Sequence, residues 1–121
     1  IEEAQLDAAS IDAVSSHGTA TPNNDSVESN AIVDVFGPDV PTFSTKGATG
    51  HTLGACGALE AVIALEAFER GRLPGTYGLR DIDEEVEANI LREGTDFDGD
   101  LIVSNSLAFG GNNASLILGR L

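Results

Sequence analysis

The sequence predicts an α/β fold in which short strands alternate with helices. Three short apolar runs, at 11–16, 41–45 and 101–106, have the length and residue types of strands. Longer stretches between them, most clearly 52–70, are typical of helices. At 121 residues, of which 41% are hydrophobic, the chain is large enough for one domain with a single core.

The first elements lead to a histidine. Residues 11–16 predict a strand that ends at His17, and a loop follows it. Two Asn and an Asp at 23–25 are natural helix N-caps, so we expect a helix over 26–36. His17 therefore lies at the carboxyl end of a predicted strand.

The middle of the chain leads to a long apolar helix. A second strand at 41–45 ends before Lys46, and a turn at 47–50 feeds a helix over 52–70 that Gly71 stops. This helix has scarcely any polar face, so we expect other structure to surround it on nearly all sides. A domain of this size rarely covers a helix so fully, and the chain opens without Met. We therefore expect a piece of a larger protein.

The last third ends in a pair of strands. A polar, acidic stretch at 80–99 comes first, in which 83–91 predicts a short helix or a loop. Strands at 101–106 and 114–118 follow, and the Gly- and Asn-rich connection at 109–113 predicts an antiparallel hairpin.

Charge and cysteine content exclude several classes of function. The 20 acidic and 6 basic residues give a net charge of -14, which repels phosphate backbones and anionic lipid headgroups. We therefore expect no nucleic-acid or membrane partner. The single Cys cannot form an intrachain disulfide, and no apolar run reaches the roughly 18 residues of a membrane helix. A reducing compartment fits best, so we expect a cytoplasmic protein.

Two histidines carry the candidate chemistry. His17 is followed by a Gly and by the hydroxyls of Thr19 and Thr21, which suit close backbone approach and hydrogen bonds to a ligand amide. His51 stands at the start of the long helix, where the helix dipole disfavours an imidazolium and leaves a neutral N–H donor. Two such donors suit an oxygen that acquires negative charge. The alternative is that the two histidines are unrelated in space.

Glu60 lies inside the apolar helix with small and apolar residues one turn before and after it. Its carboxylate is therefore expected to be buried and to need a partner. Lys46, the only Lys in the chain, is the candidate. The alternative is that Glu60 reaches solvent through a gap in the packing.

Cys56 invites a different interpretation, because it follows His51 by five residues and a thiol beside an imidazole can act as a nucleophile. Its neighbours are small, so we expect a helix-packing residue instead. A metal site made of Cys56, both histidines and Asp25 lacks the short-range ligand spacing of structural zinc, so we expect none. The Gly-rich stretches match no nucleotide-binding motif.

Three motifs resemble one family. They are HGTATPNND at 17–25, STKGATGHTLGA at 44–55 and NSLAFGGNNA at 105–114. Together they resemble the C-terminal half of a beta-ketoacyl-[acyl-carrier-protein] synthase of the decarboxylating, elongating type, within the thiolase superfamily. The resemblance implies the C-terminal half of a thiolase-type α/β fold, in which two similar halves stack as five alternating layers, αβαβα, in the full enzyme.

The resemblance also assigns roles to four polar residues. It implies that His17 and His51 are the imidazoles of a Cys-His-His triad and hold the malonyl thioester oxygen while decarboxylation builds an enolate. Lys46 matches the lysine that accompanies the second histidine. Glu60 matches a glutamate of the same network.

Further positions match substrate contacts of the family. Thr19 and Thr21 match residues that hydrogen-bond the phosphopantetheine arm. Phe109 matches a gating aromatic whose backbone N–H completes the oxyanion hole. Ala108 replaces a Gly of the last motif, which is a departure from the family pattern.

The nucleophilic Cys of this family belongs to the N-terminal half, and nothing in this chain corresponds to it. The resemblance thus implies an acyltransferase that condenses an acyl thioester with malonyl carrier protein, in fatty acid or polyketide biosynthesis. Residues 1–121 would be its C-terminal domain, inactive alone. The implied partners are acyl carrier protein, the N-terminal half and a second copy in a homodimer. The only implied prosthetic group is the phosphopantetheine of the carrier.

Two alternatives stay open. A degradative thiolase also has a Gly-His step in its second motif, but it lacks the first motif and carries a Cys near its C terminus. A non-catalytic chain-length partner subunit of a polyketide heterodimer is the other, and the presence of both histidines argues against it.

Overall fold

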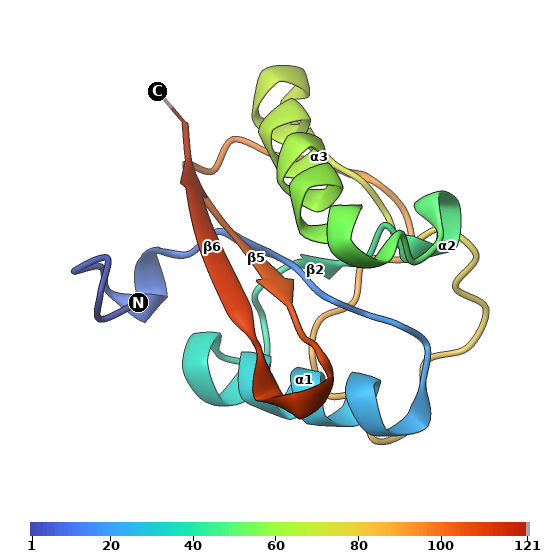
Figure 1. The fold of residues 1–121 in the computed structure, drawn as a ribbon. Helices are drawn as coiled ribbons and strands as arrows, with labels where there is room; N and C mark the ends of the chain where they lie inside the picture. Colours follow the sequence, from blue (N-terminus) through green and yellow to red (C-terminus); the bar gives the residue numbers. More distant parts are fainter. Residues whose placement is uncertain (121) are drawn as a thin grey trace.

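Two long helices enclose a four-stranded mixed sheet in the computed structural model, which describes residues 1–120. The strands are β1 (Ala13–Ser15), β2 (Thr42–Phe43), β5 (Leu101–Ser106) and β6 (Ala114–Gly119), and the helices are α1 (Pro22–Phe36) and α3 (Cys56–Arg70). A single 3-10 turn, η1 (Ala8–Ser10), precedes β1. The strand order is β2-β1-β5-β6, with α3 over one face of the sheet and α1 over the other (Figure 1).

The sheet places a strand from early in the chain beside strands from its last fifth. β1 pairs in parallel with both β2 and β5, so that Val14 lies opposite Thr42 on one side and Val103 on the other. β5 and β6 form an antiparallel hairpin along their whole length, joined through the short 3-10 segment η3 (Phe109–Gly111). The predicted α/β class, the three strands and the hairpin are confirmed.

Successive side chains of the central strands β1 and β5 point to opposite faces of the sheet, so the core has two parts. Ala13 and Ile102 cluster with the apolar side chains of α3. Val14 and Val103, one position further on, cluster with Ile32 of α1 on the other face. Both strands are therefore buried on both sides, and because they run parallel, the loops that follow them leave at the same edge of the sheet.

α1 begins before the residues at 23–25 that sequence analysis takes as its caps. Pro22 is its first residue and Thr21 its N-cap, and no side chain caps it. Proline favours this start because its φ is already helical and its missing N–H needs no partner. The prediction of Asn or Asp caps is wrong. Asn24 instead lies within the first turn and donates a hydrogen bond towards Glu28.

The long helix is placed slightly later than the sequence predicts. The predicted turn after β2 is a single helical turn, α2 (Lys46–Thr49), and the 3-10 segment η2 (Leu53–Ala55) follows it. α3 begins only at Cys56. Its predicted end is confirmed: Gly71 adopts the left-handed conformation (φ 60°, ψ 33°), which costs glycine no steric strain.

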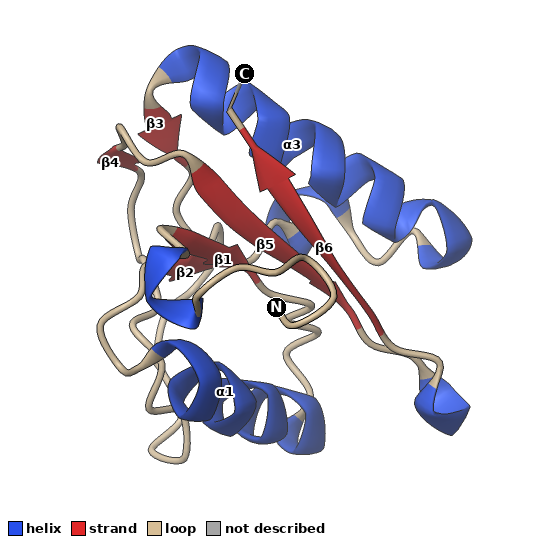
Figure 2. Cartoon of the chain, turned by 90° about the vertical axis from the view of Figure 1, so that its left-hand side faces the viewer, coloured by secondary structure: helices blue, strands red, loops and turns tan. Residues whose placement is uncertain are grey.

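A small second sheet follows α3. β3 (Arg72–Leu73) pairs antiparallel with β4 (Thr95–Asp96) beside the C-terminal end of α3 (Figure 2). Strands of two residues leave no alternating pattern, so the sequence does not predict them. The stretch 83–91 is a loop, and the helical alternative for it is wrong. Its last residues hydrogen-bond to the backbone of Thr42 instead.

One face of α3 is uncovered. Val62 and Leu65 are 56% and 46% exposed, whereas Ala64 and Phe68 on the opposite side are buried. The described residues thus cover this helix on one side, and the expectation that other structure surrounds it stays a prediction. No helix within residues 1–120 is long and apolar enough to cross a membrane.

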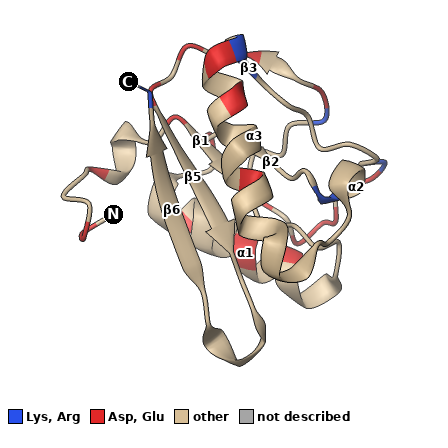
Figure 3. Cartoon of the chain, turned by 45° about the horizontal axis from the view of Figure 1, so that its top comes forward, with Lys and Arg blue, Asp and Glu red and all other residues tan. Residues whose placement is uncertain are grey.

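Acidic residues are spread over both long helices, the N-terminal segment and the loops, whereas basic residues are few and scattered (Figure 3). Most of the basic side chains lie at the surface. Lys46 is the exception, because its side chain is buried. This single buried cation marks the region where the polar residues converge.

Candidate active site

Both histidines lie at one edge of the sheet. His17 follows the end of β1 and Lys46 follows the end of β2. Because these strands are parallel, the two residues leave the sheet at its carboxyl edge, where sites in α/β folds form. The chain returns there after α2, and the ring centroids of His17 and His51 are 5.3 Å apart with their planes at 85°. The alternative in which the histidines are unrelated in space is wrong.

A buried ion pair lies close to His17. The Lys46 ammonium donates to Oε1 of Glu60. Lys46 is 8% exposed and Glu60 2% exposed, so solvent ions screen the pair little. The predicted pairing is confirmed, and the alternative with Glu60 in solvent is wrong. Within residues 1–120, Oε2 of Glu60 has no hydrogen-bond partner.

The His17 imidazole is kept neutral by its surroundings. Burial lowers its pKa, and the Lys46 ammonium lowers the pKa further. At neutral pH the ring therefore has one N–H donor and one acceptor nitrogen. Its Nδ1 is buried and forms no hydrogen bond to any described residue. A ligand atom could use this free hydrogen-bonding capacity.

His51 lies in a different setting from the one that the sequence predicts. It is exposed, and it lies between α2 and η2, ahead of α3, which begins at Cys56. A helix dipole is felt within the first turn of the helix, so the predicted effect of α3 on His51 is wrong. Leu53, two residues later, has a φ of 54°, which is uncommon outside glycine. The loop that carries His51 is therefore tightly bent.

Cys56 points into the same cluster. Its thiol donates to Oε1 of Glu60 at 3.2 Å, and burial followed by this hydrogen bond raises the pKa of the thiol. A thiol held protonated is a poor nucleophile, which favours the packing interpretation. Cys56, His17 and Glu60 each offer a potential metal ligand within 4.8 Å of the others. The Lys46 ammonium already supplies the positive charge at this carboxylate.

The other predicted site residues lie further out. The hydroxyls of Thr19 and Thr21 are 2.9 Å apart and hydrogen-bond to each other. Between them Ala20 has a φ of 57°, so the turn that presents the two hydroxyls is sharply bent. Phe109 lies in η3, at the connection of the hairpin, with its ring fully exposed.

Sequence analysis missed Glu28. This residue of α1 is 4% exposed, and burial raises the pKa of its carboxyl. Its two oxygens accept hydrogen bonds from the backbone N–H groups of His17 and Gly18. Helical spacing could have indicated it, because Glu28 shares a face of α1 with the buried Ile32 one turn later.

Comparison with known proteins identifies the family. Residues 1–80 match the family described as "Beta-ketoacyl synthase, C-terminal domain". The chain belongs to the beta-ketoacyl synthase family. It is 42% identical over 113 residues to 3-oxoacyl-[acyl-carrier-protein] synthase 1 of Escherichia coli K12, covering 92% of this chain and 28% of the relative. The family resemblance inferred from the three motifs is confirmed.

Solved ketosynthase structures have the same fold. A beta-ketoacyl synthase from Burkholderia phymatum STM815 is 42% identical with a TM-score of 0.95, over 99% of this chain and 30% of that one. A ketosynthase from Xenorhabdus doucetiae, in complex with its chain length factor, is 41% identical with a TM-score of 0.91, over 99% of this chain and 31% of that one. The chain thus spans about a third of the length of the proteins that it matches.

The first prediction concerns the buried pair. Replacing Lys46 by Ala should lower the free energy of unfolding by roughly 3–5 kcal/mol, because it leaves the Glu60 carboxylate buried and unpaired. Urea unfolding of the full-length protein measures the loss. Arg70→Ala is the control, since it removes an exposed pair with Glu66 that contributes about 0–1 kcal/mol. Equally small losses in both variants would contradict a buried pair.

The second prediction concerns the loss of folding stability at low pH. The folded pKa of His17 lies below its unfolded value of about 6.5, so the unfolded state binds more protons between the two values. The stabilising contribution of neutral His17 is therefore complete above pH 6.5 and is lost as the pH falls through the folded pKa. Proton NMR of the imidazole should give a midpoint below 6.5 for His17. A midpoint at or above this value would contradict the burial argument.

Proposed function

We propose that this domain carries the decarboxylating part of the active site of a beta-ketoacyl-[acyl-carrier-protein] synthase, in fatty acid or polyketide biosynthesis. One observation carries the proposal: two imidazoles lie 5.3 Å apart at the edge of the sheet, and the buried Lys46 ammonium is close enough to His17 to lower its pKa. Polar groups fixed in this way before the reaction suit the stabilisation of a developing negative charge.

The proposed chemistry begins with a malonyl thioester. Decarboxylation breaks the bond between its carboxylate and its methylene carbon, and the electron pair moves to the thioester carbonyl. N–H groups of His17 and His51 donate to the enolate oxygen that forms, and the neutral His17 imidazole keeps one N–H donor for this role. The enolate carbon then attacks an acyl thioester on a nucleophilic Cys, which leaves as a thiolate.

The remaining site residues fit supporting roles in this reaction. Lys46, held by Glu60, keeps positive charge beside the histidines and favours neutral His17. Thr19 and Thr21 would hydrogen-bond the pantetheine arm that carries the malonyl group. Phe109 would gate the site through the connection between β5 and β6. No cofactor beyond the phosphopantetheine of the carrier takes part in the proposed steps.

The proposed partners follow from the family. The matched Escherichia coli relative is named for acyl carrier protein, which we propose as the partner that delivers both substrates. The nucleophilic Cys would come from an N-terminal half, and the whole enzyme would be a cytoplasmic homodimer. With a net charge of -14, this domain would repel an acidic carrier, so carrier docking would depend on basic residues of the other half.

A non-catalytic chain-length subunit is the second candidate. A chain length factor accompanies the ketosynthase in one of the matched structures. Both imidazoles are present here and lie face to edge, which favours the condensing subunit.

The third prediction tests the histidines. In the full-length protein, replacing His17 or His51 by Ala should slow the decarboxylation of malonyl carrier protein about 100-fold or more, because each loses one donor to the enolate oxygen. Transfer of the acyl group to the enzyme should be affected less. Release of carbon dioxide measures the decarboxylation step, and unchanged release in either variant would contradict the proposal.

The fourth prediction concerns residues 1–121 expressed alone. They should form no ketoacyl product, because the proposed nucleophile is absent, and the exposed face of α3 with Val62 and Leu65 should cause self-association. Addition of the Cys-bearing half should restore condensation. A monomer that condenses acyl and malonyl carrier protein by itself would instead make Cys56 the nucleophile.

A further inference from the structure

We propose that Glu28 is the positioning residue for His17 and that, through Asn105, it ties the His17 turn to the β5–β6 hairpin. The inference rests on the proposed function, because it concerns how the decarboxylating imidazole is held in place. Glu28 itself touches no reacting atom in this proposal. It acts on the backbone that carries His17.

The contacts between Glu28 and the His17 turn are specific. Oε1 accepts the His17 backbone N–H at 2.7 Å, and Oε2 accepts the Gly18 backbone N–H at 2.9 Å. Hydrogen bonds from N–H groups to an ionised carboxylate are stronger than those between neutral groups. Two parallel bonds also fix the orientation of successive peptide groups. The direction in which the His17 side chain leaves the backbone is therefore set by this carboxylate.

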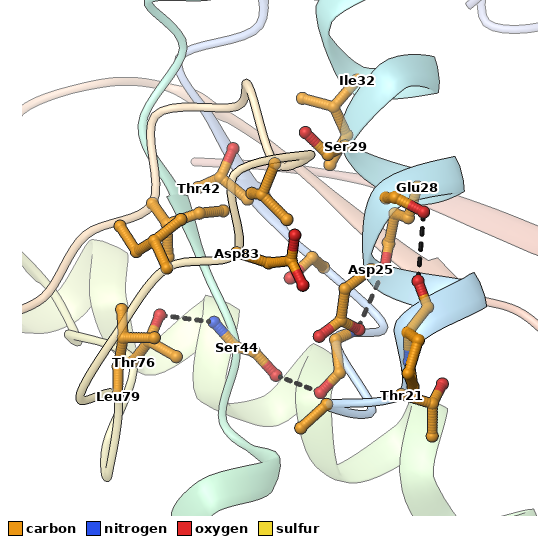
Figure 4. Close-up of a pocket in the computed structure, with 18 of the residues that line it drawn as sticks. Thr21, Asp25, Glu28, Ser29, Ile32, Thr42, Ser44, Thr76, Leu79 and Asp83 are labelled. Carbon is orange, nitrogen blue, oxygen red and sulfur yellow. Dashed lines mark hydrogen bonds between the residues drawn. The ribbon is translucent and has the colours of Figure 1, made fainter.

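Packing alone does not hold this turn. Glu28, Gly18 and Thr21 line a cavity of about 280 Å³ between α1 and the loop that follows β3 (Figure 4). On the opposite side the turn is confined, because a Cβ on Gly18 would lie 2.6 Å from Ser44. Ser44 also donates through Oγ to the Gly18 carbonyl at 3.1 Å. Since space is open towards the cavity, the Glu28 carboxylate supplies the restraint on that side.

A third contact extends the network to the hairpin. Asn105 of β5 donates through Nδ2 to Oε1 of Glu28 at 3.3 Å, the oxygen that also accepts the His17 N–H. Oδ1 of the same Asn105 side chain accepts a hydrogen bond from Oγ of Ser115 in β6 at 2.8 Å. Asn105 and Ser115 lie on facing strands next to the connection that bears Phe109. A shift of the hairpin at this level therefore changes the hydrogen bonding of the residue that orients His17.

The test compares two partial reactions in the full-length protein. Glu28→Gln keeps the size of the side chain but directs an NH₂ group at one of the two backbone N–H donors. We expect carbon dioxide release from malonyl carrier protein to fall roughly 10- to 100-fold, since small displacements of a reacting group cost this much. Acylation of the enzyme by acyl carrier protein, followed by mass spectrometry, should change less than about threefold. Asp34→Asn, which neutralises an exposed carboxylate on the same helix, is the matched control and should leave both rates unchanged.

The variant Asn105→Ala tests the link to the hairpin. It should slow decarboxylation by itself, and combined with Glu28→Gln it should add less than the product of the two separate effects, because both act through one network. Equal fractional loss of decarboxylation and of enzyme acylation in Glu28→Gln would overturn the inference. So would a loss of decarboxylation in the double variant that equals the product of the losses in the two single variants. Where Glu28→Gln fails to fold, Glu28→Asp, which keeps both oxygens on a shorter stem, gives the same comparison.

His17→Ala is assayed in parallel to separate the two proposals. Unchanged decarboxylation in His17→Ala would overturn the proposed function, and this inference with it. Loss in His17→Ala without selective loss in Glu28→Gln would overturn only the positioning role.

Discussion

A carboxylate in the middle of an apolar helix has to be matched by a cation, and this requirement organises the site. Glu60 is almost completely buried in α3, so its charge depends on the Lys46 ammonium. The pair draws α2 against α3 and thereby fixes the loop between them, which carries His51. Gly47 lets the backbone of Tyr77 lie directly against α2, because a Cβ at that position would lie 1.9 Å from the Tyr77 carbonyl oxygen. The placement of one imidazole thus follows from the neutralisation of one buried charge.

The other imidazole is placed by the sheet. β1 lies between two parallel neighbours and is buried on both faces, so the chain that leaves it can take few paths. Its turn carries His17 towards His51, and hydrogen bonds to Glu28 and Ser44 restrain it from two sides. The site therefore joins a rigid strand end to a loop held by an ion pair. The Lys46 ammonium acts on both parts of the site: it pairs with Glu60 beside the loop, and it lowers the pKa of His17 at the strand end.

How much of the fold and of the site could be predicted from the sequence depends on whether each interaction is reflected in residue types. The Lys46–Glu60 pair was accessible to reasoning from sequence because the chain has a single Lys and Glu60 is the carboxylate that lies within the apolar run of the helix. The strands of the main sheet were accessible through their apolar runs, and the histidines through their motifs. The start of α1 at Pro22 was not, because several competing capping residues lie within one turn of it. Glu28 was not predicted because its hydrogen bonds to the His17 turn come from backbone N–H groups, which leave no trace in the identity of the residues.

The topology of the sheet has a consequence for the order of folding. β1 acquires its second neighbour only when β5 is available, and these strands are separated by most of the chain. Contacts between residues so far apart in sequence form slowly, because a long loop has to close before they gain any free energy. On a ribosome that adds roughly 5–20 residues per second, β1 waits for several seconds with one edge unpaired. The bond from Asn105 to Glu28 forms at the end of that wait, so the turn with His17 takes its final shape only when the last strands are in place.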